Sequence, residues 1–134
     1  MTDPISPARY GERTLRAKAA VAQAGASALL VGVGPELEWL TGYAAPGGER
    51  LNLLVIPADG DVAYVSPRLE APAARAAPGL AEGRVRLETW EETDDPYLLV
   101  PGLLPPREPL RPLVSDGLRA QFVLGLQTVL PGAG

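Results

Sequence analysis

Helical periodicity and short apolar runs alternate along the first third of the chain. Residues 8–24 (ARYGERTLRAKAAVAQA) have the spacing of a helix, with Ser6-Pro7 as its cap and first-turn proline and Gly25 as the residue that ends it. The apolar stripe expected on this helix consists of Leu15, Ala19 and Ala22. Residues 28–33 (ALLVGV) are continuously apolar, which predicts a strand covered on both faces.

The middle of the chain predicts a pair of strands between two short helices. Residues 35–40 form a short helix or turn. Two apolar runs, 51–56 and 62–66, flank the turn residues PADGD at 57–61, which is the pattern of a strand, a tight turn and a second strand. Residues 67–77 (PRLEAPAARAA) are then helical, with an early proline that marks a first turn or a kink.

The last third of the chain continues this alternation. Residues 84–90 alternate polar and apolar side chains, which predicts a strand with one wet face. Residues 97–104 predict a short helix broken by a Pro-Gly pair, and residues 113–115 a short strand after a proline-rich connector. Residues 117–130 predict a helix, whose apolar face consists of Leu118, Phe122, Leu126 and Leu130. The connector prolines are Pro105, Pro106, Pro109 and Pro112.

Helices alternating with strands, with one hairpin between them, predict an α/β domain with a mixed sheet of about five strands and helices on both faces. The length of 134 residues suits a single domain over 1–134. The sequence ends in LPGAG, and Pro-Gly usually leads into a further element. We therefore expect the sequence to be part of a longer one.

The charge pattern argues against nucleic-acid and membrane partners. The net charge is −4 and the twelve basic residues are scattered, unlike the basic patch that binds nucleic acid. No apolar run is long enough for a membrane span, and the N-terminal residues lack the apolar core of a signal peptide. We expect a cytoplasmic location.

Two missing residue types limit the chemistry of the chain. It contains no Cys, which excludes thiolate nucleophiles, disulfides and zinc held by cysteine. It contains no His, which excludes an imidazole base, a Ser-His-Asp triad and any metal site that uses histidine. As an enzyme on its own the chain is poorly equipped.

Three candidate sites are better explained as structural features. Gly32 and Gly34 suggest a dinucleotide loop, but Leu37 stands where a third glycine belongs and Pro35 lacks an N–H for phosphate. The turn carboxylates Asp59 and Asp61 favour a tight turn without any catalytic role. A late acidic cluster, which could bind a hard cation, matches no calcium loop and indicates a solvated loop. Its members are Glu88, Glu91, Glu92, Asp94 and Asp95.

Two arginines occupy positions where α/β proteins present functional side chains. Arg50 ends a glycine-rich loop just before a strand, and Arg68 begins a helix just after one. A guanidinium is a rigid fork that suits carboxylates, although the simpler role is a surface ion pair, for instance with Glu49 or Glu70. The aromatic residues Trp39 and Tyr43 could be packing residues or a stacking platform.

Several motifs together resemble the opening of the Xaa-Pro peptidase and creatinase family. The segment AQAG is followed by ASALLVGVGPELEWLTGY, then by Arg50 before an apolar strand. LLVIPADGDVAYVSPRLE covers residues 53–70, and LQTVLPGA lies near the end of the chain. The most specific of these pieces are WLTGY at 39–43 and PADG at 57–60 followed by VSPRLE at 65–70. The resemblance spans nearly the whole chain, in order and at matching spacing.

This resemblance implies an N-terminal, non-catalytic domain with a ribonuclease-H-like mixed sheet. It implies a catalytic "pita-bread" domain C-terminal to residue 134, which holds two divalent metal ions (Mn, Co or Zn) through two Asp, one His and two Glu and cleaves before proline. The N-terminal domain would support a homo-oligomer such as a dimer and rim a neighbouring active site. The matching rim position is Arg50, with Tyr43, Trp39 and Arg68 nearby. The small AAPGG loop favours a peptidase over a creatine hydrolase.

A stand-alone α/β binding or assembly module with no peptidase partner is the alternative. A small carboxylate-dependent hydrolase of the ribonuclease H type is a third possibility, but the predicted strands carry too few acids to hold Mg²⁺. The identity of the metal, the residue preferred before proline and the oligomeric state are open at this point.

Overall fold

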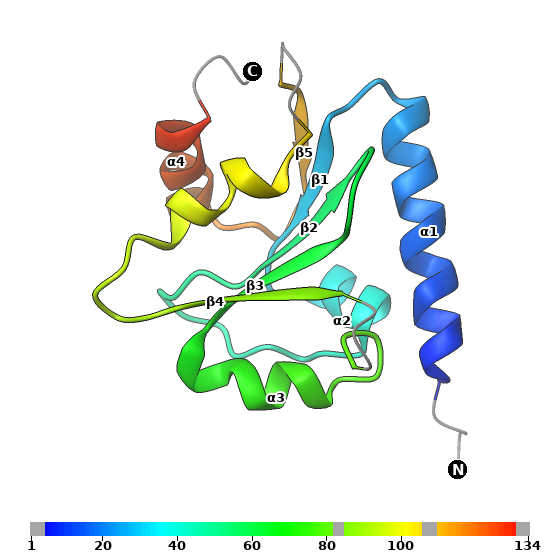
Figure 1. Ribbon diagram of the computed structural model, residues 1–134, viewed down its shortest axis with the longest axis horizontal. Coiled ribbons are helices and arrows are strands. Elements are labelled where there is room, and N and C mark those ends of the chain that lie inside the picture. The colour runs from blue at the N-terminus through cyan, green and yellow to red at the C-terminus, as the bar shows by residue number, and fades with distance from the viewer. Residues whose placement is uncertain (1–4, 82–84, 106–109, 131–134) are drawn as a thin grey trace.

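A computed structural model describes residues 5–81, 85–105 and 110–130 (Figure 1). Its strands are β1 (Ala28–Val31), β2 (Leu53–Pro57), β3 (Ala63–Pro67), β4 (Arg86–Trp90) and β5 (Pro112–Val114). Its α-helices are α1 (Pro7–Gln23), α2 (Pro35–Thr41), α3 (Ala71–Ala76) and α4 (Ala120–Val129). Its 3₁₀ helices are η1 (Arg68–Glu70), η2 (Pro96–Leu99) and η3 (Pro101–Leu103). Among these described elements, no helix is long and apolar enough to cross a membrane.

The five strands form one mixed sheet in the order β4-β3-β2-β1-β5. The β2–β3 hairpin is antiparallel, as the turn at 57–61 predicts, and β2 also pairs antiparallel with β1. The two outer strands join in parallel, β4 to β3 and β5 to β1. The α/β class and the mixed sheet of about five strands are therefore confirmed.

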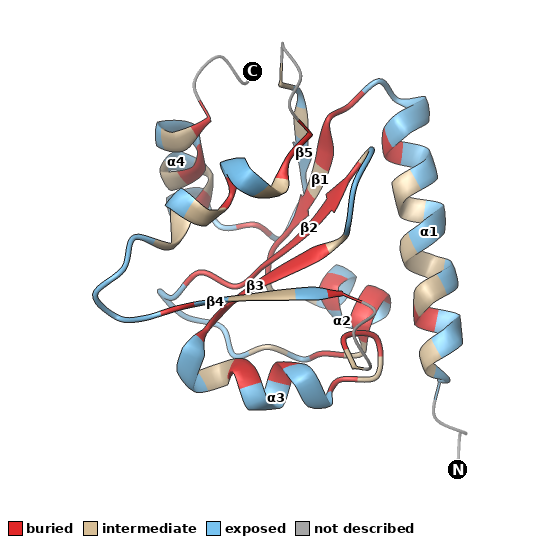
Figure 2. Cartoon of the chain, in the orientation of Figure 1, coloured by how far each residue is buried: buried red, intermediate tan, exposed pale blue. Residues whose placement is uncertain are grey.

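Helices cover both faces of the sheet and create two hydrophobic clusters. Leu30, Val55 and Val65 point to one face, where they pack with α4, η2 and η3. Alternate strand residues, including Val31, Leu54 and Tyr64, point to the other face, where α2 and α3 lie and Ala17 of α1 packs. Figure 2 shows the result, with the central strands buried and the outer helix surfaces exposed.

The stripe predicted for the first helix is wrong, although the helix and its caps are correct. Ser6 caps α1 by accepting a hydrogen bond from the Arg9 N–H, and Gly25 follows it with φ of 71°. The buried residues of α1 are Tyr10 and Val21, whereas Leu15 is 67% exposed. The Tyr10 ring lies against Gly42 at the end of α2, and burying this ring removes more apolar surface from water than burying an alanine of the predicted stripe.

The last helix also differs from its prediction at one end. Its predicted apolar residues Leu118, Phe122, Leu126 and Leu130 are all buried, as expected. The helix begins at Ala120, however, and not at Gly117. Leu118 N–H instead donates to Ser115 O in a tight turn, which places Leu118 against Gly32 before the helix starts.

The remaining elements agree with the sequence in kind. The predicted helix at 67–77 begins as η1 and continues as α3, with Pro72 in the first turn of α3. The predicted helix at 97–104 is indeed broken, but the break lies at Val100 between η2 and η3, and Pro101-Gly102 begins η3. The start of the predicted strand at Arg84, the connector residues Pro106 and Pro109, and the end of the chain from 131 onward lie outside the described residues.

Candidate functional site

The topology of the sheet brings three separated segments to one edge. β2 runs antiparallel to β3, while β4 runs parallel to β3. The beginning of β2 therefore lies beside the ends of β3 and β4. Figure 1 shows the start of β2 beside the ends of β3 and β4. Arg50 precedes β2, Arg68 follows β3, and Glu91 follows β4, so all three residues lie at this edge.

Each candidate arginine forms an ion pair with the loop after β4. Arg50 Nε lies 2.6 Å from Glu92 Oε1, with the two side chains 50% and 60% exposed. Arg68 Nη1 donates to Glu91 Oε1. This hydrogen bond, together with the charge of Glu91, raises the pKa of the Arg68 guanidinium. The partners of Arg50 and Arg68 are therefore not Glu49 or Glu70. The strand order brings the loop after β4, which is distant in sequence, next to both arginines.

The acidic cluster consists of residues with structural partners. Glu88 pairs with Arg86 on β4. Asp94 Oδ2 accepts from the Glu91 N–H at 2.9 Å, and Asp95 Oδ1 accepts from the Tyr97 N–H at 3.1 Å. Within the part of the chain that the structure describes, no group of three acidic side chains could hold a metal ion. The described residues therefore do not fit a two-metal centre of the kind that the family resemblance implies for a C-terminal domain.

The glycine-rich loop ahead of Arg50 is held by the start of α4. Arg119 Nη1 donates to Gly48 O at 2.9 Å, and Gln121 Nε2 donates to Glu49 O at 3.4 Å. On its other side, Trp90 Nε1 donates to Leu51 O at 3.1 Å. These bonds tie the Arg50 segment to both α4 and β4, so its backbone does not depend on the exposed ion pair alone.

Buried polar side chains support this edge from beneath. Tyr64 Oη donates to Asn52 Oδ1 at 2.8 Å, and Asn52 Nδ2 donates to Glu70 Oε1 at 3.2 Å. The ring of Tyr43 packs edge-on against Tyr64, with the ring centroids 5.7 Å apart. Burial is the main cause that raises the pKa of both tyrosines, and the charge of Glu70 adds to it. The Tyr43 hydroxyl is buried and has no hydrogen-bond partner among the described residues.

The LTGY motif at 40–43 forms the turn that ends α2. Gly42 adopts φ of 74° and donates its N–H to Glu38 O, which closes the helix. Thr41 Oγ1 donates to Leu37 O and accepts from the Tyr43 N–H. A Cβ on Gly42 would lie 2.8 Å from Pro78 and 2.9 Å from the Tyr10 ring. The motif thus directs Tyr43, which is 6% exposed, into the core.

Trp39 lies away from the two arginines, beside α1. The Arg13 guanidinium sits 4.4 Å from the Trp39 ring centroid and donates to the Trp39 carbonyl at 2.7 Å. Trp39 is 54% exposed and borders a groove of about 700 Å³ between α1, α2, β1 and β5. The structure therefore brings Arg50 and Arg68 to one edge, places Tyr43 beneath it, and separates Trp39 from them.

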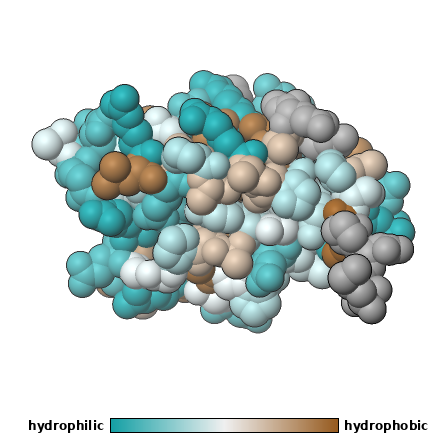
Figure 3. Space-filling model, turned by 90° about the horizontal axis from the view of Figure 1, so that it is seen from below, coloured by the Kyte–Doolittle hydropathy of each residue, from teal (hydrophilic) through white to brown (hydrophobic). Residues whose placement is uncertain are grey.

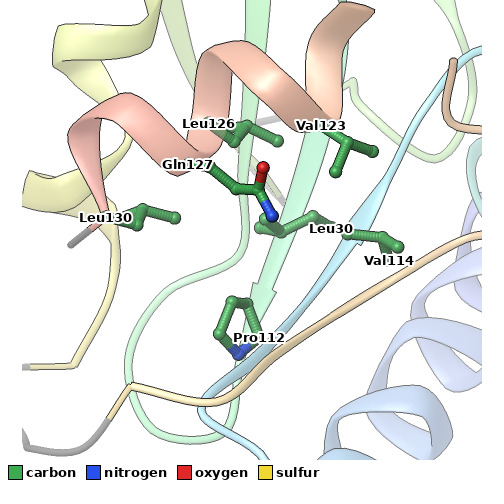
Figure 4. A pocket seen from close by; sticks show the side chains of 7 residues that line it. All are labelled: Leu30, Pro112, Val114, Val123, Leu126, Gln127 and Leu130. Atoms are coloured by element: carbon green, nitrogen blue, oxygen red, sulfur yellow. The ribbon is translucent and has the colours of Figure 1, made fainter. Parts of the chain in front are cut away.

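A second, smaller pocket lies between α4 and the β1–β5 edge of the sheet (Figure 4). Its volume is about 120 Å³ and its lining is apolar apart from Gln127, whose side chain is seen among Leu30, Leu126 and Val123. It offers no charged side chain to a ligand. The molecular face seen in Figure 3 is mostly hydrophilic or intermediate in hydropathy, with strongly hydrophobic residues in a few small patches.

Gly32 has a packing role. A Cβ at this position would lie 2.7 Å from Leu118 Cδ1 and 3.1 Å from Leu118 Cα, so the glycine allows the chain before α4 to approach β1. The Gly32 N–H donates to Ser115 Oγ at 3.0 Å. These contacts support the view that this loop is a strand-to-helix turn.

Sequence reasoning missed the residues that surround the arginines. A signal was available for Asn52, because it is a polar side chain within an apolar strand pattern and such a residue needs a buried partner. No local signal paired Glu92 with Arg50 or Glu91 with Arg68, since these partners are distant in sequence. The same holds for Arg119, which contacts the loop ahead of Arg50.

Comparisons with known proteins agree with the fold. Residues 13–133 match the creatinase/prolidase N-terminal domain family. The probable dipeptidase PepE of Mycobacterium tuberculosis is 39% identical over 121 residues, which cover 90% of this chain and 32% of that protein. The chain thus spans about a third of the length of the curated relatives it matches.

Solved structures show the same fold. Dipeptidase PepE from Mycobacterium ulcerans aligns with a TM-score of 0.87 and 34% identity, over 96% of this chain and 34% of that one. The N-terminal domain of an Xaa-Pro dipeptidase from Lactobacillus brevis aligns with a TM-score of 0.76 and 17% identity, over 91% and 90% of the two chains. The second likeness concerns the fold alone. The chain belongs to the creatinase/prolidase N-terminal domain family.

Proposed function

We propose that this chain is the non-catalytic N-terminal domain of an Xaa-Pro dipeptidase or aminopeptidase. The proposal combines membership of the family with the names of its relatives, which are dipeptidases and prolidases. The parent protein is a cytoplasmic homo-oligomer, and its catalytic domain lies C-terminal to residue 134. That domain holds the two divalent metal ions, Mn, Co or Zn, for which the described residues of this chain offer no group of ligands.

The observation that carries the proposal for the site is the convergence of Arg50 and Arg68 at one exposed edge. In the proposed role, this edge forms one wall of a substrate pocket in the oligomer. A peptide ends in a carboxylate, and an arginine fork at a pocket wall binds that group and limits the length of the peptide. The rim roles of Tyr43 and Trp39 stay predictions. Tyr43 is buried in this chain, and Trp39 lies beside Arg13 of α1 and not beside Arg50 or Arg68.

Two assays test this function. The 134-residue chain supplied with Mn²⁺, Co²⁺ or Zn²⁺ should not hydrolyse Xaa-Pro peptides, and turnover by the chain alone would refute the non-catalytic role. In the protein that includes the catalytic domain, Arg50→Ala should raise the KM for dipeptides more than for longer peptides. An equal effect at all lengths would make Arg50 a structural residue.

The alternative of a stand-alone binding or assembly module is tested by the reading frame. Codons after Gly134 that encode an Asp, Asp, His, Glu, Glu series support the peptidase. A stop codon directly after Gly134 supports the module.

A further inference from the structure

Both exposed arginines of the candidate site are already bound to carboxylates. Arg50 presents its Nε edge to Glu92 at 2.6 Å, and Arg68 is bound to Glu91. The edge of a guanidinium that includes Nε is one of those that bind a carboxylate through two parallel hydrogen bonds. The Glu92 carboxylate thus occupies a position that the carboxylate of a peptide would use.

The loop that carries Glu92 is held in a defined shape. The Glu91 N–H donates to Asp94 Oδ2, and the Asp94 N–H donates back to Glu91 O, both at 2.9 Å. The Trp90 side chain joins the same strand end to Leu51 O, next to Arg50. Since both partners of the ion pair are anchored through their backbones, Glu92 is presented to Arg50 by the fold.

The ion pair is nevertheless easy to exchange. Both side chains are at least half exposed, and ion pairs of this kind contribute little free energy because water and salt screen them. A second carboxylate can therefore replace Glu92 at a cost of about two- to fivefold in its affinity.

We propose that Glu92 competes with the ligand carboxylate for Arg50, so that a peptide or a free amino acid binds this edge by exchanging one carboxylate for another. This inference rests on the proposed function, in which Arg50 binds the substrate carboxylate. The competition weakens the hold of Arg50 on every carboxylate ligand, which favours release of a product that carries a free carboxyl group. A neutral ligand carries no charge with which to displace Glu92, so its binding should not depend on Glu92.

Glu92→Gln in the enzyme that includes the catalytic domain is the direct test. The variant should lower the KM for Gly-Pro and the inhibition constant of free proline about two- to fivefold. It should leave both values unchanged for the corresponding C-terminal amides. The effect should vanish in an Arg50→Ala background. Glu88→Gln is the matched control, because it removes the same charge from the same segment but breaks the pair with Arg86.

The possible failures are distinct. If Arg50→Ala weakens the binding of carboxylate ligands no more than that of their amides, the proposed function of this edge is wrong and the competition is wrong with it. The competition alone is refuted if Arg50→Ala weakens carboxylate ligands selectively but Glu92→Gln does not lower the KM. The same holds if Glu92→Gln has no larger effect than Glu88→Gln. A raised KM would show that Glu92 orients Arg50.

A readout independent of activity is available in the 134-residue chain. Sodium acetate is titrated while the Nε–H resonance of Arg50, identified by its absence in Arg50→Ala, is followed by NMR. Glu92→Gln should reach its half-maximal shift at an acetate concentration about two- to fivefold lower than wild type and Glu88→Gln. Equal acetate responses in all three proteins would overturn the competition.

Discussion

The hydroxyl of Tyr64 donates a hydrogen bond of 2.8 Å to Oδ1 of Asn52, in the part of the core directly beneath the candidate site. Both residues are buried, and the Asn52 amide group continues the connection to Glu70 at 3.2 Å. Asn52 lies two positions after Arg50 and Glu70 two positions after Arg68. The same hydrogen bonds therefore stabilise the core and join the two segments that carry the arginines.

Asn52→Ala should destabilise the domain, because it leaves the Tyr64 hydroxyl buried without its acceptor. Loss of one partner from a buried hydrogen bond costs about 1–3 kcal/mol in the free energy of unfolding. Urea denaturation measures this loss. In a double-mutant cycle, Asn52→Ala combined with Tyr64→Phe should cost less than the sum of the two single changes. Additive costs would show that the bond contributes nothing.

Tyr43→Phe and Tyr64→Phe should have opposite effects. The Tyr64 hydroxyl has an acceptor, so its removal should lower the free energy of unfolding by about 1 kcal/mol. The Tyr43 hydroxyl is buried and unpartnered among the described residues, so its removal should leave stability unchanged or raise it by about 1 kcal/mol. Urea denaturation measures the free energy of unfolding of both variants, and each variant is the control for the other because both remove one buried hydroxyl. A clear loss for Tyr43→Phe would reveal a partner for its hydroxyl.

Stability should fall at alkaline pH through the buried tyrosines. An unfolded tyrosine loses its proton near pH 10, whereas burial raises the pKa of Tyr64 in the folded chain. Above about pH 10 the unfolded state therefore binds fewer protons, and the free energy of unfolding decreases by up to about 1.4 kcal/mol per pH unit for this residue. Below that pH the contribution is fully present.

Denaturation between pH 8 and 11 measures this slope, with Tyr64→Phe as the comparison. The variant should lose less stability per pH unit than wild type, because it lacks the titrating group. Parallel slopes would mean that Tyr64 titrates equally in both states. Burial also raises the pKa of Tyr43 and Tyr97, and both residues contribute equally to the slopes of wild type and variant.

Gly42→Ala should be strongly destabilising, and Gly47→Ala should not. Gly42 has φ of 74°, and a methyl group there would lie within 2.9 Å of Pro78 and Tyr10. The backbone conformation alone costs a non-glycine residue about 1–2 kcal/mol, and the contact adds to this. A Cβ on Gly47 would meet nothing within 4 Å. Thermal unfolding of the two variants checks the difference, and equal melting temperatures would contradict it.

The sequence by itself determined the class of the fold and most of its elements. Buried strands correspond to the apolar runs at 28–33 and 51–56. The buried face of the last helix corresponds to its four predicted apolar residues. The spacing of apolar residues within a segment predicts which of its side chains are buried, and this spacing can be read from the segment alone. The WLTGY motif likewise carries its own turn, because Gly42 alone provides the positive φ that closes α2.

Only the tertiary structure decided which residues meet at the site. Arg50 is bound by Glu92 rather than by Glu49 or Glu70, because the order of β2, β3 and β4 brings the loop after β4 to the start of β2. The same is true of α1, where packing on the sheet buried Tyr10 and Val21 and left Leu15 in solvent. Contacts between distant segments depend on strand order and on the fit of neighbouring side chains, and neither is present in a local pattern.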